Sequence, residues 1–172
     1  MPTVVDGVTS FVSHQSPCGW LGSARACRCS PEQVTRYQGR LSGPLLDRID
    51  LHVEVPALAP AELLDAPAGE PTAPVQARCS AARDRALHRQ GKGNHALQGE
   101  EIDRHALMSP SAGDFLRNVA ARLGWSARST HRVLKVARTI ADLAESTTME
   151  VVHVAEAVQY RRVLPACHES LH

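Results

Sequence analysis

Ser126-Ala-Arg-Ser-Thr-His-Arg-Val-Leu-Lys-Val-Ala-Arg-Thr-Ile-Ala-Asp-Leu143 is the stretch that decides the fold. Ser126 is a preferred N-cap residue, and the apolar residues that follow it recur at intervals of three and four. These residues are Val133, Val136, Ala137, Ile140, Leu143 and Ala144. The spacing predicts a helix that starts at Ser126 and buries one face, so it needs neighbours to pack against.

Further helices are predicted on both sides of this stretch. Ser109-Pro110 is a helix start, and Gly124 is the usual kind of helix end. The apolar face between them consists of Phe115, Leu116, Val119, Ala120 and Leu123. Thr147-Thr148-Met149-Glu150 has the pattern of a capping box for a last helix that reaches about Arg161. With helices at 76–89 and 99–107, residues 76–165 are predicted to form a helical bundle, followed by a tail at 166–172.

The chain before residue 76 has a different pattern. Prolines at 56, 60, 67, 71 and 74 predict an extended linker, placed at 57–75, because proline removes backbone donors. Ile49, Leu51, Val53 and Val55 alternate with polar residues, which predicts a strand with one buried face. A capping box at Ser30–Gln33 predicts one helix, and a second short helix is expected from Pro44 to Arg48. Residues 1–56 therefore read as a small α/β region.

The composition limits the class of protein. Apolar residues make up 43% of the chain and aromatic residues only 3%, so the core must be built from Leu, Val, Ile and Ala, which suits helices. The net charge of +1 does not by itself require a nucleic-acid partner. No signal peptide is visible, and no stretch approaches the roughly 18 apolar residues of a membrane helix. We expect a cytoplasmic protein without membrane contact.

Basic residues gather along the 126–143 helix. Arg128 is expected in its first turn, where a cation is disfavoured but where free backbone N–H groups attract anions. Arg128 is thus either a solvated arginine or part of a phosphate site. Arg132, Lys135 and Arg138 follow on the side opposite the apolar face, either as a solvated surface or as a contact for the phosphates of nucleotide or DNA.

Three of the five cysteines lie close together, at Cys18, Cys27 and Cys29. This clustering is typical of a reducing compartment and of a metal site, not of a disulfide framework. Three thiolates leave one position of a tetrahedral zinc site for His14 or water. Three reduced thiols without a metal are the alternative reading.

Two blocks carry a resemblance to a known family. The first runs from Cys27-Arg-Cys-Ser-Pro-Glu-Gln through Gly43-Pro-Leu-Leu-Asp-Arg48 to Pro56, and the second joins 126–143 to His153-Val-Ala-Glu-Ala-Val-Gln-Tyr-Arg161. Both closely resemble the C-terminal half of the ComM-like, magnesium-chelatase-related AAA+ ATPases. The resemblance implies the end of an α/β AAA+ core in residues 1–56 and a helical lid in residues 76–165, mostly α overall.

The resemblance also implies roles for individual residues. Arg48 corresponds to the arginine finger, which stabilises charge on the γ-phosphate held by a neighbouring subunit. Arg128 corresponds to the sensor 2 arginine, which contacts nucleotide on its own subunit. The family implies ATP and magnesium as cofactors, a homo-hexameric ring, and ATP-driven branch migration of DNA by a helicase in natural transformation.

The sequence departs from the family at two places. It has no Gly-x-x-x-x-Gly-Lys-Ser/Thr loop and no apolar strand ending in Asp-Glu, so the phosphate cradle and the magnesium carboxylates are missing from it. Where the family commonly reads Asn-Pro-Cys-Pro-Cys-Gly, this chain reads His14-Gln-Ser-Pro-Cys-Gly19, with His14 in place of the sensor 1 asparagine and Ser16 in place of one cysteine.

Three functional readings remain open. The chain is a ComM-like ATPase fragment that does not turn over ATP alone, or a non-enzymatic helical module that binds DNA or regulates. In the third reading it docks onto intact AAA+ subunits through its Arg48 edge.

Overall fold

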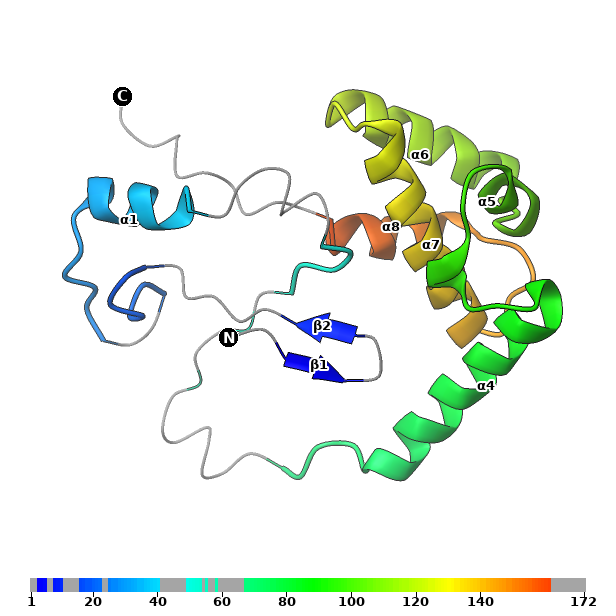
Figure 1. Cartoon of the computed structure of the whole chain (residues 1–172), viewed down its shortest axis with the longest axis horizontal. Coiled ribbons are helices and arrows are strands. Elements are labelled where there is room, and N and C mark those ends of the chain that lie inside the picture. Colours follow the sequence, from blue (N-terminus) through cyan, green and yellow to red (C-terminus); the bar gives the residue numbers. More distant parts are fainter. Residues whose placement is uncertain are drawn as a thin grey trace. The chain divides into compact units, whose positions relative to one another are not determined.

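The computed structural model describes residues 3–5, 8–10, 16–22, 25–40, 49–53, 55, 58 and 67–161. These residues fall into two compact units (Figure 1). The described part of unit 1 is 3–5, 8–10, 16–22, 25–40, 55, 58 and 67, and that of unit 2 is 49–53 and 68–161. Each unit is described by itself.

The described part of unit 1 contains a short hairpin, a cysteine-bearing loop and one helix. Strands β1 (Thr3–Val5) and β2 (Val8–Ser10) pair antiparallel, with Thr3 opposite Ser10. Helix α1 (Pro31–Gln38) begins as predicted, because the Ser30 side chain accepts from the Gln33 amide while the Gln33 side chain accepts from the Ser30 amide. Val34 is its buried residue. The short helix expected at 44–48, and Arg48 with it, lies outside the described residues.

Unit 2 is a helical bundle centred on α7 (Ala127–Leu143). Around α7 pack α4 (Thr72–Gln90), the short 3-10 helix η1 (Asn94–Ala96), α5 (Glu100–His105) and α8 (Val151–Gln159). Helix α6 (Pro110–Arg122) packs on α8. The predicted helical bundle is therefore confirmed, whereas the α/β core expected in residues 1–56 stays a prediction.

The core of the bundle is aliphatic, as the low aromatic content predicted. Its buried side chains come from the α5–α6 region, from α7 and from α8, and all are Leu, Ile, Val, Ala or Met. They are Leu97, Ile102, Ala106, Ala112, Leu116, Val119, Val133, Leu134, Ala137, Ala141, Met149, Val154, Ala157 and Val158. Phe115, Trp125, Val136 and Ile140 pack against this cluster, whereas Leu123 and Leu143 are largely exposed.

Two helix starts agree with the predicted caps. The Ser109 hydroxyl accepts from the Ala112 amide at the start of α6, and the Ser126 hydroxyl accepts from the Ser129 amide at the start of α7. Gly124, between the two helices, has φ = 61°. This left-handed backbone conformation favours glycine, so the turn after α6 depends on it.

The last helix begins later than predicted. The expected capping box started at Thr147, but α8 starts at Val151 with Glu150 as the N-cap residue. The carbonyl groups of Ser146 and Thr147 accept hydrogen bonds from Arg138, and this holds the segment in a loop. The Glu150 amide instead donates to Nδ1 of His153.

The strand predicted at 49–55 is wrong for the residues that the structure describes, since 49–53 and 55 form no strand. The backbone of this segment bonds to the helical bundle instead. The His52 amide donates to the Tyr160 carbonyl at 2.8 Å, and the Ile49 carbonyl accepts from Arg161. The alternating apolar side chains therefore find no buried face here, and Leu51, Val53 and Val55 are exposed.

The predicted linker also ends earlier than expected. Helix α4 already begins at Thr72 and includes Pro74, because proline is tolerated in the first turn of a helix. Residues 72–80 of α4 are exposed apart from half-buried Val75, and its buried residues are Ala82 and Ala86. Figure 1 shows the later part of α4 beside α7 and the earlier part running away from it. No helix in the described part of the chain is long and apolar enough to cross a membrane.

Candidate functional site

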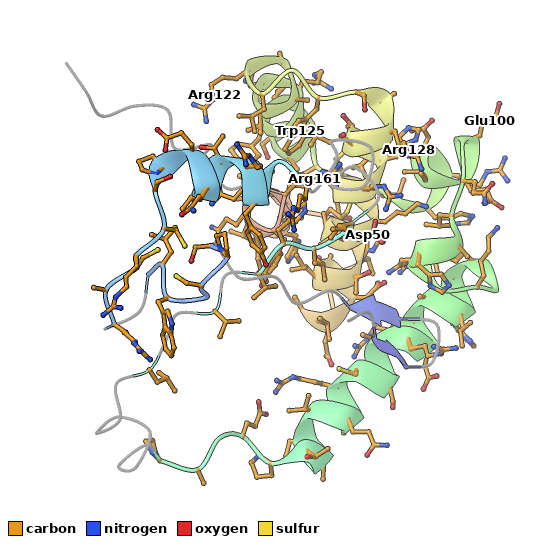
Figure 2. The ribbon with its side chains drawn as sticks, turned by 60° about the vertical axis from the view of Figure 1, so that its left-hand side comes forward. Asp50, Glu100, Arg122, Trp125, Arg128 and Arg161 are labelled. Atoms are coloured by element: carbon orange, nitrogen blue, oxygen red, sulfur yellow. The ribbon has the colours of Figure 1, made fainter. Side chains whose placement is uncertain are left out.

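The first turn of α7 carries the first candidate site. Arg128 is exposed there, beside backbone N–H groups that have no partner within the helix (Figure 2). The Ser126 side chain caps one of these groups, the amide of Ser129, at 3.2 Å. Arg128 therefore lies where its position in the sequence predicted, on a surface that favours an anion.

Arg161 supports this turn from inside the bundle. Its side chain is only 5% exposed, and it donates to the hydroxyl of Ser129 at 3.2 Å and to the carbonyl of Ile49 at 2.6 Å. It thereby joins the end of α8, the first turn of α7 and the 49–53 segment. Sequence reasoning missed this role, although an arginine that ends an apolar helix is a usable signal for a buried polar contact.

His52 lies against the same support. Both of its ring nitrogens are buried and have no hydrogen-bond partner. Burial first, and the positive charge of Arg161 second, hold the pKa of His52 below its usual value, against a smaller opposing effect of the Tyr160 backbone. The fold therefore favours the neutral imidazole where the 49–53 segment meets the bundle.

The predicted basic stripe on α7 is largely engaged within the protein. Arg132 pairs with Asp50 and is 19% exposed. Lys135 donates to the carbonyl of His95 at 3.0 Å, and burial lowers its pKa, with Asp50 opposing this effect and Arg132 adding to it. Both residues have internal partners in place of phosphates.

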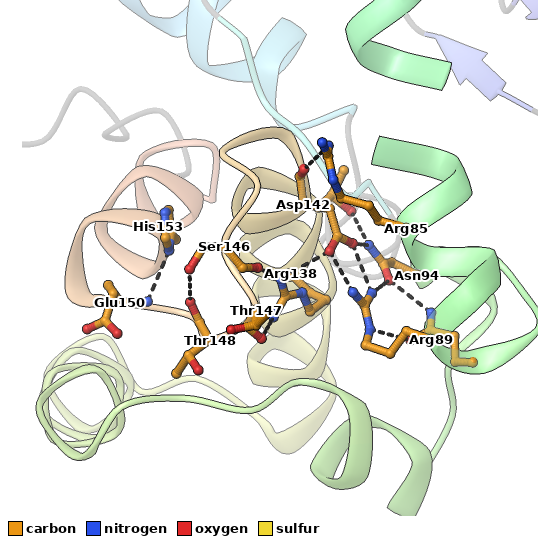
Figure 3. Close-up of polar contacts among 12 residues, drawn as sticks. Arg85, Arg89, Asn94, Arg138, Asp142, Ser146, Thr147, Thr148, Glu150 and His153 are labelled. Atoms are coloured by element: carbon orange, nitrogen blue, oxygen red, sulfur yellow. Dashed lines mark hydrogen bonds and ion pairs between the residues drawn. The ribbon is translucent and has the colours of Figure 1, made fainter. Parts of the chain in front are cut away.

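Arg138 corrects the prediction outright, because its side chain is fully buried and offers no atom to an external phosphate. It donates to Asp142 at 3.0 Å and to the carbonyls of Ser146 and Thr147 (Figure 3). Its spacing of four residues from Asp142 is the sequence signal for an ion pair on one helix face. Arg138 thus belongs to the interior of the bundle.

Asp142 is the centre of that interior cluster (Figure 3). Its carboxylate accepts from Arg89 at 2.6 and 2.9 Å and from the side-chain amide of Asn94 at 2.8 Å. It also accepts the hydrogen bond from Arg138. Burial alone would raise the pKa of Asp142, but the hydrogen bonds from Arg89 and Asn94 and the charges of Arg138 and Arg89 outweigh it and lower the pKa. The cluster ties α4 and η1 to α7.

The second candidate site is the cysteine cluster of unit 1. The sulfurs of Cys18, Cys27 and Cys29 all lie within 4.8 Å of one another, and those of Cys18 and Cys27 are 3.4 Å apart. The Ser16 hydroxyl, the Trp20 amide and the neighbouring thiols lower the pKa of Cys18 to about 6, whereas the hydrogen bond with Cys18 raises that of Cys29. These three cysteines can hold a metal ion. His14 lies outside the described residues.

A basic hollow borders this cluster. It has a volume of about 580 Å³, and Cys18 and Cys29 line it together with Arg36 and Tyr37 of α1 and with Arg40 just after that helix. Arg28, Arg36 and Arg40 are exposed and form no ion pair among the described residues. These three arginines of unit 1 thus differ from Arg132 and Arg138 of α7, which form ion pairs within the protein.

Comparison with known proteins identifies the bundle and the region before it. The family model of the magnesium chelatase subunit ChlI C-terminal region matches residues 69–161, and that of the magnesium chelatase subunit ChlI matches residues 9–63. The C-terminal model covers more than half of the chain, so the chain belongs to the magnesium chelatase subunit ChlI family.

Individual relatives agree with this assignment. The uncharacterized protein YifB of Salmonella typhimurium is 43% identical over 79% of this chain and 27% of its own length. Competence protein ComM of Haemophilus influenzae is 41% identical over 80% of this chain and 27% of its own length. The uncharacterized protein Rv2897c of Mycobacterium tuberculosis is 36% identical over 88% of this chain and 31% of its own length. The chain therefore spans about three tenths or less of these relatives.

Proposed function

We propose that this chain is the lid-bearing part of a ComM-like, magnesium-chelatase-related AAA+ ATPase, and that Arg128 contacts the phosphates of a nucleotide. The family role is ATP-driven remodelling of DNA, with branch migration during natural transformation. The observation that carries the proposal is the exposed Arg128 at the open first turn of α7, supported by buried Arg161. Backbone N–H groups and a guanidinium together favour an anionic ligand there.

The residues of this chain fit only part of a nucleotide site. The sequence has no phosphate loop and no strand with magnesium carboxylates, so another polypeptide segment must hold the ATP and magnesium. In this proposal Arg128 senses the nucleotide, and Arg48, the arginine finger, reaches a nucleotide in the next subunit of a homo-hexamer. In the docking reading, the same Arg48 edge meets an intact AAA+ subunit in place of a second copy of this chain.

A titration with a fluorescent ATP analogue and magnesium tests the Arg128 assignment. We expect weak, micromolar or poorer binding by the whole chain and no ATP hydrolysis. Loss of one charge-assisted contact of about 1.5–3 kcal/mol in Arg128→Ala should weaken binding roughly tenfold to a hundredfold. Arg122→Ala, at an exposed arginine in the last turn of α6, is the matched control and should bind like the wild type.

Two results would contradict this proposal. Binding that Arg128→Ala leaves unchanged removes Arg128 from the nucleotide site. Sustained ATP turnover by the purified chain shows that the chain holds a complete site of its own.

A second candidate function is contact with DNA by a non-enzymatic or regulatory module. The observation that favours it is the set of unpaired, exposed arginines in unit 1, namely Arg28, Arg36 and Arg40. Arg36 lies in the last turn of α1 and Arg40 in the turn directly after it, and both line the same hollow. We expect phosphate contacts from this face in place of Arg132, Lys135 and Arg138.

Duplex binding measured against salt concentration tests this second function. Each phosphate contact contributes about 0.9 to the slope of log affinity against log salt, so Arg36→Ala/Arg40→Ala should reduce the slope by about two. Arg83→Ala, at an exposed arginine on α4, is the matched control. A slope that the double variant does not alter removes α1 from the DNA interface.

We further propose that Cys18, Cys27 and Cys29 bind one zinc ion that clamps the unit 1 loop to the start of α1. Thiolates are preferred zinc ligands, and the three sulfurs are already gathered. Zinc analysis of the purified, reduced chain should give one ion per chain, and Cys27→Ser should lose it. A zinc content of Cys27→Ser equal to that of the wild type would refute the site.

A further inference from the structure

Ser16 is part of the cysteine cluster, although serine is not a usual metal ligand. Its side chain is fully buried, and its hydroxyl oxygen lies 3.4 Å from the sulfur of Cys18. The Leu21 amide donates to the same oxygen at 3.3 Å, while the Ser16 carbonyl accepts from the Gly19 amide at 3.0 Å. The turn at 16–21 therefore fixes one oxygen beside the sulfurs.

Two of the separations can be compared with the edges of a coordination tetrahedron. With zinc–sulfur bonds of about 2.3 Å and zinc–oxygen bonds of about 2.0 Å, sulfurs are about 3.8 Å apart and sulfur and oxygen about 3.5 Å. The Cys18–Cys27 separation of 3.4 Å and the Ser16–Cys18 separation of 3.4 Å lie close to these values. All three sulfurs lie within 4.8 Å of one another, so one ion can be shared among them.

The described residues offer no stronger fourth ligand. The group that gathers here consists of three cysteines, and no described histidine, aspartate or glutamate joins it. Ser16 supplies the one further side-chain oxygen that is bonded within the cluster.

We propose that the Ser16 hydroxyl oxygen is the fourth ligand of this metal site, giving zinc three sulfur ligands and one oxygen ligand. The inference rests on the proposed zinc site and adds its coordination. A hydroxyl oxygen binds zinc less strongly than a thiolate, so this position is the weak one of the four. The site therefore holds zinc reversibly, unlike a closed site with four thiolates.

The test uses the full chain, reduced with a phosphine and free of metal. Cobalt(II) is titrated in and its visible absorption recorded, because the charge-transfer intensity rises with the number of thiolates. Zinc affinity is then measured by competition with a coloured chelator. The variants are Ser16→Cys and Ser16→Ala. Ser111→Cys, at an exposed serine on α6, is the matched control for an added thiol.

We expect Ser16→Cys to add a fourth thiolate signal and to tighten zinc binding by at least about tenfold, in the range that ligand-environment changes produce. Ser16→Ala should weaken zinc binding several-fold, and Ser111→Cys should match the wild type. His14→Ala should also match the wild type, because Ser16 already fills the fourth position.

The outcomes separate this inference from the zinc proposal. If wild type binds cobalt(II) but neither Ser16 variant alters the spectrum or the affinity, the Ser16 ligand is refuted and the three-cysteine site stands. Equal affinity of Ser16→Ala and wild type, or loss of binding in His14→Ala, also refutes it. If neither wild type nor Ser16→Cys binds cobalt(II), the zinc site itself is refuted. Binding by Ser16→Cys alone refutes both zinc binding by the natural chain and the Ser16 hydroxyl as its ligand.

Discussion

Replacing Asp142 with alanine should be among the most destabilising single changes in the helical bundle. The carboxylate is 2% exposed at its side chain and accepts hydrogen bonds from Arg89, Asn94 and Arg138. Its loss leaves the guanidinium of Arg138, whose side chain is fully buried, without a counter-charge. Arg89 is 24% exposed at its side chain and can turn toward water, so the cost arises mainly at Arg138.

The size of the effect follows from this geometry. Removing one partner of a buried ion pair costs about 3–5 kcal/mol. A domain of this kind is stable by about 5–15 kcal/mol, so the change removes a large share of its unfolding free energy. At about 4–8 °C per kcal/mol for a domain of this size, Tm should fall by more than about 10 °C.

Far-UV circular dichroism during urea and thermal unfolding measures this loss. The matched control is Asp114→Ala, which breaks the exposed pair with Arg117 on α6, whose side chains are 68% and 72% exposed. Such a surface pair contributes less than about 1 kcal/mol. If Asp142→Ala costs no more than Asp114→Ala, the buried cluster does not stabilise the bundle as argued.

Three further predictions concern the support of α7. Because folding lowers the pKa of His52, the unfolded chain takes up a proton at this imidazole first as the pH falls. The free energy of unfolding should therefore decrease as pH drops from about 6.5 toward the folded pKa. Urea unfolding of His52→Gln should show a weaker decrease, and an equal pH dependence would contradict the assignment. Ser126→Ala removes the cap of α7 and should cost about 1 kcal/mol in the same assay, whereas no change would mean that the cap is redundant. Arg161→Ala removes the bond to Ile49, so hydrogen exchange of the His52 amide should accelerate; unchanged protection would show that the 49–53 segment is held by other contacts.

Much of the bundle could be predicted because its signals are local. Serine caps and a glycine stop define α6 and α7 through contacts within four residues, and the capping box of α1 does the same. Sequence spacing alone describes such contacts. The placement of Arg128 in the first turn of α7 follows from the Ser126 cap for the same reason.

Other features depend on partners far away in the sequence. The alternation at 49–55 has the period of a strand, but a strand requires a neighbouring strand, and the described backbone bonds to Tyr160 and Arg161 instead. Arg138 was grouped with Arg132 and Lys135 because all three are basic. Its burial follows from Asp142, which Arg89 and Asn94 join from α4 and η1. Contacts across 48 and 53 residues leave no periodic pattern.

The cysteine cluster was predicted in part, because some of its contacts are local in the sequence and others are not. Spacing alone gathers Cys27 and Cys29, and it also predicted a site together with Cys18. The resemblance placed Ser16 where the family carries a cysteine, but the sequence did not indicate that its hydroxyl would still lie beside the sulfurs. The buried hydroxyl becomes visible only once the turn at 16–21 is folded.

The partial burial of α4 has a mechanical consequence. A helix of 19 residues is about 28 Å long. Its first half meets solvent, while Arg89 near its other end grips Asp142. The helix is thus held to the bundle near its last turns, and its first turns extend beyond the bundle. Because α4 is one continuous helix, a movement of the chain at Thr72 would be passed to its contacts with α7, the helix that presents Arg128.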